Sequence, residues 1–174
     1  MKKFFITSLL LLVTLAGNSQ KVYGTFSLPT DEKFLSVKWD WSKALIDNKF
    51  NEQEWITVVG DNVWEDAKKE AMLLITREMN DKLDNSRIMV ISPESDKKTA
   101  YTLYITPVKY NKKGFNDSYY ILIDNNTENQ IGMCKISGRG GVVGSIGNLL
   151  GDGYEEAAAN MGNILRRYNK LKRQ

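Results

Sequence analysis

A glycine-rich segment near the end of the chain is the first place where residue types suggest chemistry. It spans residues 138–153, holds seven of the thirteen glycines and precedes a predicted helix. Such a backbone can cradle a phosphate, let another backbone approach closely, or turn the chain between a strand and a helix. The residues between the glycines decide among these three roles.

Neither common nucleotide-binding motif is complete in this segment. A P-loop has a lysine before its serine or threonine, because the lysine contacts the β and γ phosphates, and Gly144-Ser145 has no lysine between. A Rossmann loop needs three spaced glycines after the first strand. Here Val143 occupies the third position and the segment follows the last predicted strand. We therefore expect no nucleotide or other cofactor.

The aliphatic residues of the segment, which include Val142, Val143 and Ile146, favour packing instead. The small-residue spacing of close helix contacts occurs twice, at 140–144 and 147–151. Three interpretations stay open: the segment packs under its own domain, pairs with another subunit, or inserts shallowly in a membrane surface. Packing inside the domain is the commonest of the three.

Histidine is absent and cysteine occurs once, which removes Ser-His-Asp and Cys-His nucleophiles and the helical zinc motif. Cys134 has no disulfide partner, and the β-rich residues 131–136 around it predict a small buried strand residue. Asp152 and Glu155 are the carboxylates that a histidine-free hydrolase would use. Acids are also favoured at helix N-termini without catalysis, so we expect no catalytic residues.

Two further groups have a structural interpretation. Asp124-x-Asn126-x-Glu128 begins like a calcium loop, but the required glycine is replaced by Asn129, which predicts a polar hairpin turn without a metal. Trp39 and Trp41 have the spacing of one strand face and are predicted to pack in the core.

The N-terminus has the pattern of a cleavable secretory signal. Two lysines precede an apolar run at 4–16 that ends in small residues, and the run is shorter than the roughly 20 residues of a membrane span. We predict a signal peptide at 1–19 and a single domain at 20–174, located in the periplasm or outside the cell. No cysteine lies near the signal, so no lipid anchor is expected.

Charge gives no reason to expect a nucleic-acid partner. Removing the two signal lysines leaves the cations almost balanced by the 21 acids. Basic residues concentrate at 166–173, where they complement the dipole of a final helix. Contact of this basic end with a membrane surface or an acidic polymer is the alternative.

Hydrophobic periodicity predicts an α+β domain. Strands are predicted at 34–41, 87–92, 101–110, 119–124 and 130–137, helices at 61–83 and from Asp152 to Leu171, and a loop at 42–60. The order β-α-β-β-β-β-α predicts a two-layer sandwich in which two helices cover one face of a four- to five-stranded mixed sheet. Short turns make the last three strands an antiparallel meander, and Pro107 marks an edge or a bulge.

The uncovered face of this sheet is the predicted contact surface. Tyr104, Val108, Tyr120 and Leu122 are expected to project away from the helices. If no further layer covers them, they form a surface for a partner or ligand.

Several short motifs resemble small exported domains of unknown function from Bacteroidetes-type bacteria. They lie at 37–44, at 100–103 and in the glycine segment before the alanine-rich helix. In element order the chain is also similar to accessory domains of outer-membrane secretion and transport systems, of the curli secretion lipoprotein type. Both resemblances imply a role in the cell envelope and bring no catalytic residues. The lipidated cysteine of the secretion lipoproteins is missing here.

The sequence therefore favours an exported, non-enzymatic interaction module of the cell envelope. Its partner is another envelope protein or a second copy of the chain. A histidine-free carboxylate hydrolase is one alternative and requires a deep pocket with converging acids. A carrier of a small apolar ligand is another, and requires a closed cavity between the helices and the sheet.

Overall fold

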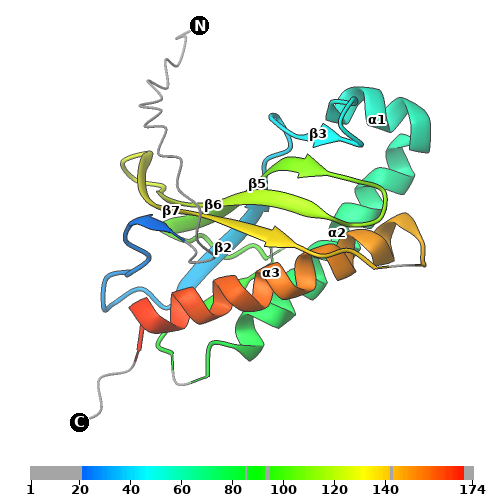
Figure 1. Ribbon diagram of the computed structural model, residues 1–174. Coiled ribbons are helices and arrows are strands. Elements are labelled where there is room, and N and C mark those ends of the chain that lie inside the picture. The colour runs from blue at the N-terminus through cyan, green and yellow to red at the C-terminus, as the bar shows by residue number, and fades with distance from the viewer. Residues whose placement is uncertain (1–20, 85, 93–94, 142, 171–174) are drawn as a thin grey trace, which may run out of the picture.

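The computed structural model describes residues 21–84, 86–92, 95–141 and 143–170. The predicted signal peptide at 1–19 lies outside the described residues. Within them the chain forms one mixed seven-stranded sheet and three helices (Figure 1). The strands are β1 (Val22–Gly24), β2 (Phe34–Trp39), β3 (Leu45–Ile46), β4 (Met89–Ile91), β5 (Tyr101–Tyr110), β6 (Asn116–Asp124) and β7 (Asn129–Gly138). The helices are α1 (Glu52–Val59), α2 (Asp61–Asp81) and α3 (Ile146–Tyr168).

The strand order confirms a mixed sheet and corrects its size. The order is β1-β7-β6-β5-β2-β4, with β3 also paired to β5. Strands β5, β6 and β7 form the predicted antiparallel meander, whereas β2 runs parallel to both β5 and β4. The register shifts between Pro107 and Lys109, which confirms a bulge at the proline. The described residues form more strands and helices than the four to five strands and two helices that were predicted.

The helix and strands that the sequence analysis did not predict lie mainly in the segment predicted as a loop. Residues 42–60 contain β3 and α1, and β1 precedes the first predicted strand. These elements are two, eight and three residues long, too short for periodicity to identify them. A capping box starts α1: Asn51 Oδ1 accepts from the Glu54 amide, and the Glu54 carboxylate accepts from the Asn51 amide.

Helices α2 and α3 lie side by side across one face of the sheet (Figure 1). Between them and the sheet is an aromatic cluster. The Trp39 ring lies 4.8 Å from that of Tyr154, and Trp41 lies 5.0 Å from Trp64, both edge-on. The two tryptophans predicted to be core residues are therefore in the core. None of the described helices combines the length and apolarity that crossing a bilayer requires.

The second half of the glycine segment is helical, which corrects the predicted start of the last helix. Helix α3 begins at Ile146 with Ser145 as its N-cap, well before Asp152. Glycine costs a helix about 1 kcal/mol relative to alanine, so the glycines concealed its first turns. The helix packs closely against α2 at these positions: a Cβ on Gly147 would lie 2.3 Å from Glu70 Oε2, and one on Gly151 would lie 2.6 Å from Leu74 Cδ1.

The crossover that enters β4 and the crossover that leaves it lie on opposite faces of the sheet. The connection from β2 to β4 contains α1 and α2 and covers the helix face. The connection from β4 to β5 steps back across β2, so a crossover of the same right hand must use the other face. Lys97 Nζ accordingly lies 3.2 Å from the ring centroid of Phe34, and Thr99 bonds Ser36, both residues of β2.

Candidate functional site

The sheet face opposite α2 and α3, here called the open face, carries the candidate site. Hydrogen-bonded contacts identify the helix face: the Ser118 and Tyr154 hydroxyls lie 2.7 Å apart, and Cys134 Sγ lies 3.8 Å from Met161 Sδ. Successive residues of a strand point to opposite faces. Tyr119, next to Ser118, therefore points to the open face.

The register places only part of the predicted contact surface there. Tyr104 pairs with Ile121 and lies on the open face, half-buried. Tyr120 and Leu122 lie on the helix face and are fully buried, so predicting them as contact residues was wrong. Burial raises the pKa of Tyr120 well above its usual value. Val108 lies at the β5 bulge and is half-buried.

Four large side chains form a continuous row across the open face. They are Tyr104 of β5, Ile121 of β6, Met133 of β7 and Tyr23 of β1, each opposite the next in the strand register. We call this row the open-face stripe. Tyr23 is 47% exposed and the other three are half-buried. Directly opposed side chains contact one another, so the stripe is one continuous surface of aromatic and aliphatic groups.

Polar and charged groups border the stripe. Lys38 of β2 is opposite Tyr104, and Lys135 of β7 pairs with Asp117 of β6 at 3.1 Å. Burial alone would raise the pKa of Asp117, but hydrogen bonds from Ser137 and Lys135 outweigh it and lower the value. Asp117 is therefore held as a carboxylate beside the apolar row.

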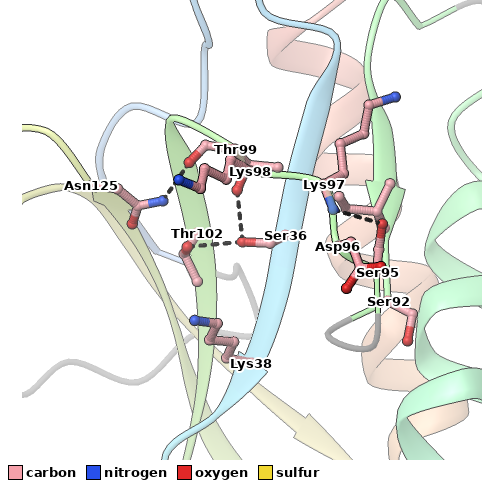
Figure 2. A pocket seen from close by; sticks show the side chains of 11 residues that line it. Ser36, Lys38, Ser92, Ser95, Asp96, Lys97, Lys98, Thr99, Thr102 and Asn125 are labelled. Atoms are coloured by element: carbon pink, nitrogen blue, oxygen red, sulfur yellow. Dashed lines mark hydrogen bonds between the residues drawn. The ribbon is translucent and has the colours of Figure 1, made fainter.

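A polar hollow adjoins the stripe beyond Lys38, with a volume of about 370 Å³ (Figure 2). Its floor is Ser36 and Lys38 of β2 with Thr102 of β5, and residues 95–99 of the β4–β5 connection form its wall. The Thr99 hydroxyl donates to Ser36 Oγ at 3.0 Å, and Ser36 Oγ lies 2.8 Å from Thr102 Oγ1. Asn125 Nδ2 donates to the Thr99 carbonyl at 2.8 Å, which fixes the rim.

The sequence prediction missed this hollow. The alternation in β2 did identify one unpacked face, since Ser36 and Lys38 alternate with the buried Leu35 and Val37. Nothing in the sequence placed the β4–β5 connection over that face. The right-handedness of the crossover from β4 to β5 would have predicted its position, once the strand order was known.

The remaining predicted contact residues belong to the glycine segment. Val143 is 88% exposed, and Ile146 is half-buried against the core at the start of α3. Val142 lies outside the described residues. The segment is neither at the hollow nor part of the open-face stripe.

The candidate carboxylates are not part of the hollow. Asp152 and Glu155 are both exposed on α3, and neither lines the hollow. In the turn after β6, which was predicted to be a polar hairpin turn, Asp124 Oδ1 accepts from the amide of Asn126. Within the described residues no cluster of acids, cysteine or histidine has the geometry to hold a metal ion.

No protein-family model and no curated protein matches the sequence. Solved structures do match. The PelC dodecamer from Paraburkholderia phytofirmans aligns with 82% of this chain and 97% of its own, at 10% identity and a TM-score of 0.47. Protein XCC0632 from Xanthomonas campestris, a DUF330 protein, aligns with 78% of this chain and 81% of its own, at 12% identity and a TM-score of 0.35. Neither match confirms the Bacteroidetes-type or curli-type resemblance.

Proposed function

We propose that the chain is an exported, non-enzymatic interaction domain of the cell envelope that binds a protein partner across its open-face stripe. One observation carries the proposal: Tyr104, Ile121, Met133 and Tyr23 form an unbroken row on the sheet face that the helices leave uncovered. Contiguous apolar surface rimmed by polar groups is typical of a contact site.

The composition of the stripe favours a protein as the partner. Tyrosine and methionine are enriched at the centres of protein interfaces, whereas lysine is depleted there and tolerated at the rim. The stripe has this arrangement, with Lys38 and Lys135 at its border. Tyrosine also supplies a large rigid surface with a polar end, which suits an interface that forms from exposed partners.

The two alternative functions have less support. A carboxylate hydrolase would use Asp152 and Glu155, which are exposed on α3 and do not line the described hollow. An apolar ligand carrier needs space between the helices and the sheet. Trp64, Tyr120 and Tyr154 are fully buried there and fill that layer.

Substitution of the stripe tests the proposal. In the Tyr104→Thr/Ile121→Thr double variant, β-branched residues keep the strand propensity while removing most of the contact surface. The matched control is Leu73→Gln on α2, because Leu73 is 54% exposed and lies outside the open face. Co-purification from envelope extracts is expected to lose its specific partner with the double variant and to keep it with the control.

Measuring the mass of the purified protein in solution distinguishes self-association from binding of a different protein. A dimer that the double variant dissociates identifies a second copy as the partner. Unchanged circular dichroism and thermal midpoint show that the variant folds. Partner capture and mass that are both unaffected by the double variant would reject the stripe as the contact surface.

A further inference from the structure

We propose that the polar hollow beside the stripe binds an anionic group, either the carboxylate of an acidic sugar or a phosphate. This site is separate from the protein contact proposed above. It lies between β2, β5 and the β4–β5 connection, and its volume of about 370 Å³ is at the lower end of the range for small-molecule pockets.

Two lysines supply the positive charge. Lys38 of β2 and Lys98 of the connection both extend toward the β5 side of the hollow (Figure 2). Neither forms a salt bridge with another residue in the described part of the chain. Two cations on the same side of a hollow favour an anionic ligand, because its negative charge attracts both of them.

The other charged groups that line the hollow do not cancel this charge. Lys97 Nζ lies over the Phe34 ring. Figure 2 shows the Lys97 side chain on the side of β2 that faces away from β5. Asp96, the acid that lines the hollow, also lies on that side of β2 in Figure 2. The part of the hollow over β5 therefore presents Lys38 and Lys98 without a facing carboxylate from the lining residues.

The hydroxyl chain leaves one proton for a ligand. Thr99 donates to Ser36, and Ser36 has one proton to give, either to Thr102 Oγ1 at 2.8 Å or to the Tyr101 carbonyl at 3.3 Å. If Ser36 donates to Thr102, the Thr102 hydroxyl proton is left to point at a ligand oxygen. A ligand oxygen in the hollow favours donation from Ser36 to Thr102, and the series of three hydroxyl groups then acts as a preorganised donor.

Asn125 adds a further donor at the rim. One hydrogen of its amide is bound to the Thr99 carbonyl, which fixes the side chain, and a primary amide has a second hydrogen. Ammonium, hydroxyl and amide groups that can donate to a ligand therefore all line the hollow. Charge-assisted hydrogen bonds of this kind are the strong ones, so the matching ligand is rich in acceptors and negatively charged.

Titration of the purified protein with three probes tests this site: glucuronate, inorganic phosphate, and glucose as the uncharged counterpart of glucuronate. Binding is followed by calorimetry and by amide chemical shifts. We expect glucuronate or phosphate to bind and to shift the amides of residues 36–38, 98–99 and 125. A response to glucuronate alone identifies an acidic sugar as the ligand, and a response to phosphate identifies a phosphate group.

Three variants locate the binding. Lys38→Gln and Lys98→Gln each remove one charge. Each is expected to raise Kd about tenfold, which corresponds to a loss of about 1.4 kcal/mol of binding free energy. Thr102→Val removes the donated proton at nearly constant volume and is expected to weaken binding several-fold. Lys33→Gln is the matched control, because Lys33 is exposed, precedes β2 and does not line the hollow.

The proposal fails if neither anion binds, if glucose binds as tightly as glucuronate, or if both lysine variants bind like the control. Its failure is distinguishable from failure of the protein contact, because Lys98 and Thr102 do not belong to the open-face stripe. Partner capture by Lys98→Gln is expected to equal that of the unmodified protein.

Discussion

Gly153 of α3 lies directly against Gly114 in the β5–β6 turn. A Cβ on Gly153 would stand 1.9 Å from the Gly114 carbonyl oxygen, and Gly114 itself has a φ of 86°. The buried Asn116 side chain bonds the Gly153 carbonyl at 2.6 Å. This contact joins the helix layer to the end of the meander, and it explains why glycine occurs inside a helix.

Gly153→Ala is therefore expected to destabilise the protein, although alanine usually stabilises a helix. The added methyl group meets backbone, which cannot move aside as a flexible side chain does. We expect a loss of about 3 kcal/mol in the free energy of unfolding, in the range of overpacked cores, measured by urea denaturation. Asn148→Ala, at an exposed position of the same helix, is the control and should change stability by less than about 0.5 kcal/mol. Equal stability of Gly153→Ala and the unmodified protein would contradict the close contact.

The buried hydroxyl pair of Ser118 and Tyr154 gives a second prediction. Tyr154→Phe removes the 2.7 Å partner of the Ser118 hydroxyl, which keeps only its longer bond of 3.3 Å to Asn116 Oδ1, and should cost about 1–2 kcal/mol. Once Tyr154 is replaced, Ser118→Ala no longer breaks the 2.7 Å bond, so the double variant should lose less than the sum of the two single losses. A double-mutant cycle by chemical denaturation measures the difference, and strictly additive losses would show that the pair does not interact.

Cys134 is predicted to be unreactive in the folded protein. It is buried in β7, and burial raises the pKa of its thiol to about 12, so the reactive thiolate is scarce at pH 8. A thiol-specific chromogenic reagent should modify the native protein far more slowly than the protein in denaturant. Native and denatured rates of similar size would contradict the buried position.

Stability is expected to fall at alkaline pH. Burial raises the pKa of Tyr110, Tyr120 and Tyr154 above the usual value of 10.0. The native state keeps these protons while the unfolded chain loses them, so their contribution is complete below about pH 10 and declines as pH rises above it. Urea denaturation at pH 8 and pH 10.5 should show this loss. The decline should be smaller in Tyr154→Phe, whereas equal stability at both pH values would refute the assignment.

Local signals in the sequence were sufficient for the meander. The β-rich run of residues 101–110 and the turn residues after Tyr110 predicted this strand with its observed bounds, Tyr101–Tyr110. The bulge followed from Pro107, which has no amide hydrogen to donate.

The orientation of β6 could not be predicted in the same way. Alternation shows that Tyr120 and Leu122 share a face, but only the register with β5 shows which face it is. Tyr104 pairs with Ile121, and a slip of one residue would have placed Tyr120 on the open face. The hairpin turn and the bulge set this register, and both are tertiary details that a linear pattern does not contain.

The candidate site depends on contacts that are distant in the chain. Ser36 and Thr99 are 63 residues apart and meet because the β4–β5 connection crosses β2. Helix α3 was misplaced for a related reason, since its glycines are poor helix formers and are explained only by the segments packed beside them, α2 and the β5–β6 turn. Long-range packing decided both features.

Site-specific photo-crosslinking tests the central claim, that the open-face stripe is the contact surface, most directly. A photoreactive phenylalanine analogue is placed at Tyr104 and, as the control, at Leu73, and the cells are irradiated before the envelope fraction is isolated. We predict a discrete protein adduct from position 104 and none from position 73. No adduct from position 104, or the same adduct from both positions, would contradict the account.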